Sequence, residues 1–304
     1  MLRSSPGPIT LRAGLALLAS VVIWTGCRAA PVPDPEKRLA AGWEHFAQGD
    51  FPQSVKDFDA VLRSIPADSP LRPRALYGLA TAWDLRRPGD NPELAARLYR
   101  DAIEANPGDE LAAWSLLALA RMPLHAPAAA VTPPDAVVMD KAYQEVIDRF
   151  PFSEPGEQAF LLQQAARLES SRPDQARVSL AALDSFLQSH PKSPYTSGVW
   201  RLIEHACVLL NLPERKLEAV LQGWKTAEID PLNPGQELAL TYWHIATIAE
   251  FDVGDFGVAR EYYRKLIDEY PTEQRVFLAK QELKRMDELE ARLRAEAAPG
   301  KGAP

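Results

Sequence analysis

The chain has 304 residues, of which 46% are hydrophobic and 25% are charged, and it contains 27 prolines but only two cysteines. This hydrophobic content excludes a wholly disordered chain, and two cysteines exclude a disulfide scaffold. The net charge of −7 argues against nucleic-acid binding, because that function needs a basic face that replaces phosphate counterions. We therefore expect a folded protein in which the unusually frequent prolines have a structural role.

The first 26 residues have the features of an export signal. Arg3 and Arg12 precede an uncharged apolar run of 12 residues, Ala13 to Trp24, which is too short to cross a bilayer as a helix. Two small residues then lead to Cys27. This arrangement resembles the lipobox of bacterial lipoproteins, although Trp24 stands where that family usually has leucine. The resemblance implies that the signal is cleaved before Cys27 and that this cysteine carries the lipid.

We expect residues 1–26 to form the signal peptide and residues 27–35, which are rich in proline, to form the lipid anchor and a short tether. The resemblance also implies a location in the cell envelope, with attachment to the membrane through the N-terminal lipid. By the sorting rule of such lipoproteins, Arg28 rather than aspartate after the cysteine favours the periplasmic face of the outer membrane. The alternatives are ordinary secretion with an incidental cysteine and an uncleaved anchor.

Prolines recur at the ends of apolar, helix-like segments, at intervals of 40 to 44 residues. Proline cannot continue a helix, and it moves the preceding residue out of the helical conformation. Each interval also holds two patterns of apolar residues spaced three and four positions apart, which predict two amphipathic helices. The sequence therefore predicts six helix-turn-helix units. The prolines that end them are Pro66, Pro107, Pro151, Pro191, Pro231 and Pro271.

A Gly-Asp-Phe turn occurs in two of these units, at residues 49–51 and 254–256. In the last unit the turn is followed by Ala259, Tyr263 and Pro271, a pattern that resembles the tetratricopeptide repeat. The resemblance implies an all-α fold, an α-solenoid of about six TPR-like repeats over residues 36–275. The family repeats every ~34 residues, so a longer interval implies longer helices or loops. The alternatives are other α-solenoids and an ordinary all-α domain of antiparallel helices.

Four segments need separate expectations. Residues 123–135 are rich in proline and alanine, which predicts a surface loop inserted in the third unit. In the last unit, one continuous first helix is expected from about residue 235 to residue 252. Residues 276–294 predict a helix with one apolar face that caps the exposed end of the solenoid core. Residues 295–304 are expected to be a disordered tail.

The sequence contains no recognisable catalytic or metal-binding pattern. None of the five histidines belongs to an H-E-x-x-H motif, and Cys207 has no partner thiol once Cys27 carries a lipid. Cys207 lies in an apolar helical stretch, which predicts a buried core residue. The 41 acidic residues are scattered along helices and form no distinct acid–base pair. We therefore expect no catalytic residue, no metal and no cofactor, and a protein that is not an enzyme.

Binding of a protein or peptide partner is the function that remains. Stacked helix pairs expose an extended concave surface, which is lined by their first helices. Trp43, Phe46 and Trp83 lie in the first helices of the first two units, where they predict an aromatic partner-binding patch. The alternative is that these side chains pack between the repeats. The expected function is a lipid-anchored interaction scaffold for protein partners in the cell envelope, without nucleic acid or small-molecule cofactor.

The lipobox, the tether and a repeat end of the form aromatic-Pro-x-Ser, residues 150–153, together resemble the barrel-assembly lipoproteins of the Gram-negative outer membrane. This second resemblance implies a role in the biogenesis of outer-membrane proteins, although no motif is specific enough to transfer partner-binding residues. A third hypothesis is a substrate-recruiting subunit of an envelope enzyme system, for example in peptidoglycan or polysaccharide handling.

Overall fold

The computed structural model describes residues 34–297, except for residue 87, residues 126–131, residue 133 and residues 228–233. Within these residues the chain forms thirteen α-helices and one short π-helix, and it forms no strand. The predicted signal peptide 1–26, Cys27, all but the last two residues of the predicted tether 27–35, and residues 298–304 of the predicted tail lie outside the described part of the chain.

The helices form six consecutive pairs and a final single helix. The pairs are α1 (Pro35–Ala47) with α2 (Phe51–Ser64), α3 (Arg72–Leu85) with α4 (Pro92–Ala105), α5 (Glu110–His125) with α6 (Ala136–Arg149), α7 (Glu154–Glu169) with α8 (Pro173–Ser189), α9 (Thr196–Leu210) with α10 (Pro213–Thr226), and α11 (Pro234–Thr247), continued by the π-helix η2 (Ile248–Val253), with α12 (Phe256–Glu269). The final helix is α13 (Arg275–Ala297).

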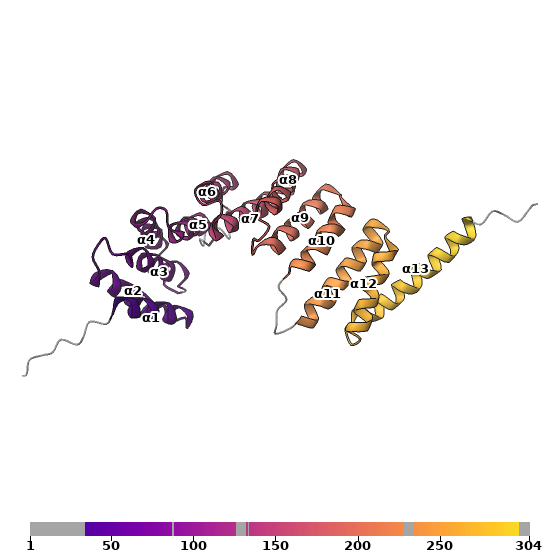
Figure 1. Ribbon diagram of the computed structural model, residues 1–304, viewed down its shortest axis with the longest axis horizontal. Coiled ribbons are helices and arrows are strands. Elements are labelled where there is room, and N and C mark those ends of the chain that lie inside the picture. Colours follow the sequence, from indigo (N-terminus) through magenta and orange to yellow (C-terminus); the bar gives the residue numbers. More distant parts are fainter. Residues whose placement is uncertain (1–33, 87, 126–131, 133, 228–233, 298–304) are drawn as a thin grey trace, which may run out of the picture.

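Each helix packs against the next one along the chain, and the pairs make an elongated, bent array (Figure 1). The first helices of successive units also pack on one another from α1 to α9. The fold is therefore an all-α solenoid of six helix-turn-helix repeats with a C-terminal capping helix. This architecture confirms the fold predicted from the proline spacing and from the resemblance to tetratricopeptide repeats.

Proline ends five of the second helices at the same place. The helices α2, α4, α6, α8 and α12 each end two residues before one of the predicted prolines. The intervening residue has left the helical conformation, as at Ile65, where φ is −109° and ψ is 152°. Because proline lacks the N–H group and its ring crowds the preceding residue, these positions fix the helix ends. The sixth predicted stop, Pro231, lies outside the described residues.

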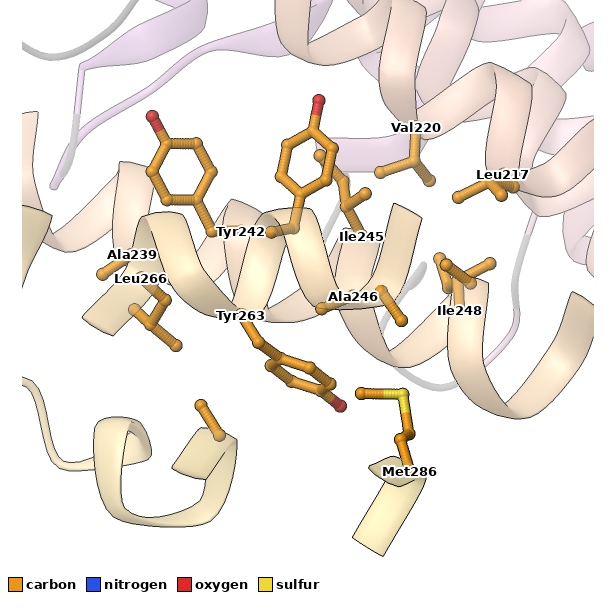
Figure 2. Packing of buried hydrophobic residues seen from close by; sticks show 14 of the residues in the cluster. Leu217, Val220, Ala239, Tyr242, Ile245, Ala246, Ile248, Tyr263, Leu266 and Met286 are labelled. Atoms are coloured by element: carbon orange, nitrogen blue, oxygen red, sulfur yellow. The ribbon is translucent and has the colours of Figure 1, made fainter. Parts of the chain in front are cut away.

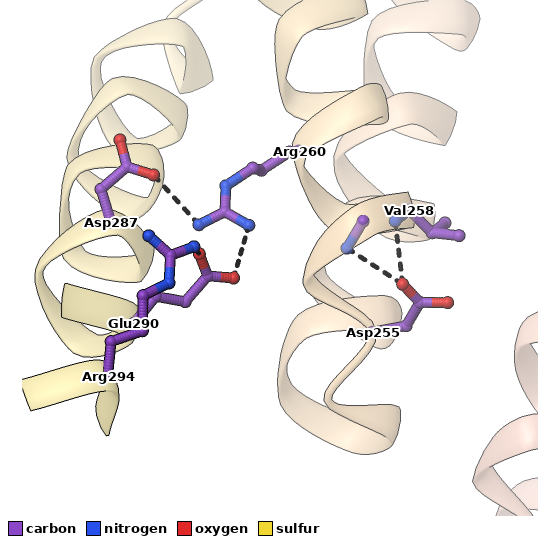
Figure 3. Close-up of polar contacts among 7 residues, drawn as sticks. Asp255, Val258, Arg260, Asp287, Glu290 and Arg294 are labelled. Carbon is purple, nitrogen blue, oxygen red and sulfur yellow. Dashed lines mark hydrogen bonds and ion pairs between the residues drawn. The ribbon is translucent and has the colours of Figure 1, made fainter. Parts of the chain in front are cut away.

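The two Gly-Asp-Phe turns share one local geometry. Gly49 and Gly254 both have φ of 79°, a left-handed conformation that glycine adopts without a steric penalty. The next residues, Asp50 and Asp255, cap the following helices because their carboxylates accept hydrogen bonds from the first free backbone N–H groups (Figure 3 for Asp255). The motif therefore forms the turn and also starts the second helix.

Phe58 is the centre of the core between units one and two, where it is fully buried. Gly42 of α1 and Gly78 of α3 both lie against its ring. A Cβ atom would lie 2.7 Å from a ring carbon at Gly42 and 2.6 Å at Gly78. Both distances are well below van der Waals contact, so glycine is what lets the two first helices approach the ring this closely.

The first helix of the last unit differs from the prediction of one continuous α-helix. The α-helical geometry ends at Thr247, and residues 248–253 form η2. Three consecutive residues of η2, Ile248, Ala249 and Glu250, are buried. Glu250 accepts a hydrogen bond from the hydroxyl of Tyr263 at 2.8 Å and pairs with Arg285 of α13. The wider π-helical turn therefore accompanies a carboxylate that points into the core and binds the capping helix.

The capping helix α13 is held by apolar packing on one face and by ion pairs beside it. Val276, Ala279 and Met286 are buried in one core cluster with α11 and α12, and Met286 lies beside Tyr263 (Figure 2). Arg260 of α12 binds Asp287 at 3.0 Å and Glu290 at 2.9 Å (Figure 3). The helix therefore covers the apolar end of the last repeat, as a terminal cap requires.

Two predicted boundaries are corrected by the structure. Residues 123–125, which the sequence assigns to a surface loop, continue α5 as far as His125. Pro123 fits the helical φ angle, but it removes one backbone hydrogen bond and its ring crowds the preceding turn, and the helix ends two residues later. At the other end, α13 extends three residues past the predicted end at residue 294. Alanine and glutamate at positions 295–297 favour helix, so the helix continues beyond its packed face.

The close approach at Phe58 gives a stability prediction. Gly78→Ala places a methyl group within 2.6 Å of the ring, so it is expected to lower the free energy of unfolding by about 1–3 kcal/mol. The measurement is urea denaturation followed by circular dichroism. Gly108→Ala is the matched control, because a Cβ atom there meets nothing within 4 Å. Equal stabilities of the two variants would show that the ring does not limit the approach of the helices.

Arg285 is predicted to offset the cost of burying Glu250. Burial raises the pKa of Glu250 above its ordinary value of 4.5, so the folded state binds the proton more tightly than the unfolded chain. Arg285→Met leaves the carboxylate with Tyr263 alone, and we expect a loss of about 1–3 kcal/mol of stability at neutral pH. This loss shrinks as the pH falls through the raised pKa, because protonated Glu250 needs no cation.

Urea denaturation of wild type and Arg285→Met at several pH values between about 7.5 and about 4.5 measures this dependence. The double variant Glu250→Gln/Arg285→Met is the control, because it removes the buried carboxylate and keeps Glu282, the other carboxylate that Arg285 binds, so its stability deficit is expected to depend on pH less than that of Arg285→Met. A deficit of Arg285→Met that is the same at every pH contradicts the assignment of its cause to the buried carboxylate.

Candidate partner-binding groove

Trp43 and Phe46, two of the aromatic residues predicted to bind a partner, lie together on α1. Their ring centroids are 5.6 Å apart. Trp43 also meets the buried ring of Phe58 edge-on at 5.1 Å and approaches Tyr77 at 6.0 Å. Both side chains are half-buried and pack against the core of units one and two. These contacts are those of side chains that pack between repeats, the alternative that the sequence left open.

Trp83, the third predicted residue, lies on α3 and packs against the same core cluster. The guanidinium of Arg86 lies 5.4 Å from its ring centroid. The structure therefore places all three aromatic residues around one core and brings Trp43 and Phe46 into direct contact. A role for them in partner binding stays a prediction.

Cys207 is buried in α9, as the sequence predicts. Its burial raises the pKa of the thiol to about 11, so the thiol is protonated at neutral pH and is a poor nucleophile. The other cysteine, Cys27, lies outside the described residues. Lipid attachment to Cys27 therefore stays a prediction.

A second set of aromatic residues lines a groove between units five and six. Trp200 of α9, Trp224 of α10 and Trp243 of α11 surround a cavity of about 420 Å³. One wall is formed by lining residues of α9, the last of which is Glu204. The other wall is formed by lining residues of α11, the first of which is Leu240, and α10 forms the floor. We call this feature the tryptophan groove, and sequence reasoning did not find it.

The tryptophan groove opens because the last unit is attached at one end of α10. Near the start of α10, Lys216 binds Asp252 of η2 at 2.7 Å, and Leu217 shares a core cluster with Ile248. Towards the other end of α10 the packing against α11 becomes sparse, and the cavity lies there. Gly223 forms part of the floor, where a Cβ atom would lie 3.2 Å from the Cβ of Trp200. The missing side chain therefore lets α10 approach α9 closely at this point.

Polar groups at the rim give the groove an uneven charge. His244 of α11 and Glu204 of α9 form a contact of 2.7 Å between Nε2 and Oε1, which bridges the two walls. Arg215 lies over the ring of Trp200 and is paired with Asp184 and Glu218. Arg201, exposed on the α9 wall, has no carboxylate within ion-pair distance among the described residues. Arg201 is therefore the lining cation that a partner carboxylate can reach without displacing an ion pair among the described residues.

The described residues contain no group of three or more His, Cys, Asp or Glu side chains arranged to hold a metal ion. Of the helices in this part of the chain, none is long and apolar enough to cross a membrane. The groove thus offers apolar surface, hydrogen-bonding groups and one cation, which are the means of non-covalent binding.

The first two repeats match a known family. Residues 39–110 match the model of the tetratricopeptide repeat. The match runs from α1 to the first residue of α5, and it agrees with the resemblance drawn from the first Gly-Asp-Phe turn, at residues 49–51. No curated protein matches the sequence.

Three solved structures are similar to this chain. PilF of Pseudomonas aeruginosa is similar with a TM-score of 0.50 and 15% identity, over 83% of this chain and 97% of that chain. PilW, a widely conserved type IV pilus biogenesis factor, has a TM-score of 0.49 and 14% identity, over 79% and 95%. A tetratricopeptide repeat protein of Parabacteroides merdae has a TM-score of 0.47 and 14% identity, over 88% and 94%. At these identities PilF supports the fold alone.

Proposed function

We propose that this protein is a lipid-anchored scaffold of the cell envelope that binds protein partners along the first-helix face of its solenoid. The observation that carries the binding role is the tryptophan groove. Three half-buried indole side chains from three helices line it, and each packs on one side against a core cluster. Aromatic side chains that line a groove in this way are typical of the places where proteins concentrate binding energy.

The anchoring role rests on the N-terminal sequence. An apolar run of 12 residues ends close to Cys27, and a proline-rich tether leads from the cysteine into α1. A lipid gains about 0.8 kcal/mol per buried CH₂, so a cysteine with more than one acyl chain is held firmly at the membrane. Confinement to a surface raises the effective concentration of partners in the same membrane. The proposal places the solenoid at the periplasmic face of the outer membrane.

Metabolic labelling with an alkyne-tagged fatty acid in a bacterial host tests the anchor. Wild type is expected to incorporate the label and to fractionate with membranes, whereas Cys27→Ala loses both properties because the acceptor thiol is gone. Cys207→Ala is the matched control, since it removes the other cysteine and keeps the lipobox. Label that persists in Cys27→Ala contradicts the proposed anchor.

Cross-linking of the labelled wild type in envelopes, followed by mass spectrometry, tests the scaffold in the same preparation. The expected result is a defined set of envelope proteins that is lost when residues 34–297 are removed. Barrel-assembly components in that set would favour a role in outer-membrane protein biogenesis, and glycan-synthesis enzymes would favour substrate recruitment for them. Absence of any enriched protein would contradict the scaffold function.

A further inference from the structure

We infer that the tryptophan groove binds a peptide segment of a partner in which a bulky apolar side chain stands next to an acidic residue. This inference deepens the proposed scaffold function and rests on it. It assigns the apolar side chain to the space between Trp200, Trp224 and Trp243, and the acidic side chain to Arg201.

The size and lining of the groove fit one large apolar side chain and its neighbours. Its volume of about 420 Å³ is in the range of ligand sites, ~300–1,000 Å³. The lining residues run along both walls, from Ser197 to Glu204 and from Leu240 to Thr247, and Leu240 at the rim is 50% exposed. An elongated opening between two helices fits a chain lying along it better than an isolated small molecule.

The charged side chains at the rim indicate which residue stands next to the apolar side chain of the peptide. The carboxylate of Glu204 contacts the ring of His244 across the groove, and Arg215 forms ion pairs with Asp184 and Glu218. Arg201 is left as the cation without a carboxylate, in a chain whose net charge is −7. A partner carboxylate next to the apolar anchor would meet this guanidinium at the edge of an apolar site, where opposite charges select a partner and fix its register. A lipid acyl chain or a neutral apolar peptide would make no use of Arg201.

The test is selection of a random dodecapeptide display library on the full-length protein, followed by affinity measurement with the enriched peptides as fluorescent synthetic probes. We expect enrichment of Phe, Trp or Leu adjacent to Asp or Glu. Leu240→Glu and Arg201→Glu are each expected to weaken binding of these probes about tenfold or more. Both positions are exposed, so neither substitution disturbs the core.

Matched controls lie on α8, outside the groove. Val178 is 55% exposed, a fraction similar to that of Leu240, and Arg177 next to it in the sequence is exposed like Arg201. Val178→Glu and Arg177→Glu therefore introduce glutamate at comparable exposed positions away from the groove. Both controls are expected to bind the probes as wild type does. A charge swap adds a readout that general damage would not move: a probe whose acidic residue is replaced by lysine should regain affinity for Arg201→Glu.

The outcomes separate this inference from the scaffold function. Probes that bind wild type and all four variants equally would overturn the groove assignment and leave the scaffold standing. Enrichment of apolar peptides without an acidic neighbour, or failure of the charge swap, would overturn the role of Arg201. If no peptide is enriched and the envelope cross-linking also enriches no protein, these results contradict the scaffold function itself.

Discussion

In the described part of the chain, the apolar faces of each helix pair are covered by the neighbouring pairs. The core is therefore a column of clusters that runs along the solenoid, and each interface depends on the next. This constraint explains the arrangement at the C-terminal end. The last helix pair is followed by α13, which covers its apolar face and supplies Arg285, the cation that pairs with buried Glu250.

The same stacking is tight at one end of the molecule and relaxed towards the other. Between units one and two, two glycines bring the first helices against Phe58 and leave no room for a methyl group. Between units five and six, the contact is concentrated at η2, so α9 and α11 separate beside it. The π-helix thus occurs next to the place where the regular packing of first helices is interrupted.

This contrast distinguishes the two sets of aromatic residues. Trp43, Phe46 and Trp83 stand in first helices whose neighbours are closely stacked, so their rings contribute to the core. Trp200, Trp224 and Trp243 also pack against core clusters, but they stand where the stacking opens, so their rings line a groove with polar groups at its rim as well. Both sets are half-buried aromatic residues, and all of them except Trp224 of α10 lie in first helices. The spacing between neighbouring helices is what separates core packing from a surface that is open to a partner.

The sequence by itself determined the helices, their pairing and the number of repeats, because proline, glycine and capping aspartate act within a few residues of their own position. The buried position of Cys207 followed from its apolar neighbours in the same way. Only the tertiary structure decided the π-helix around Glu250, since its carboxylate is bound by residues 13 and 35 positions further along the chain. It also decided the tryptophan groove, because helical periodicity gives the face on which a side chain lies but not the distance to the next repeat.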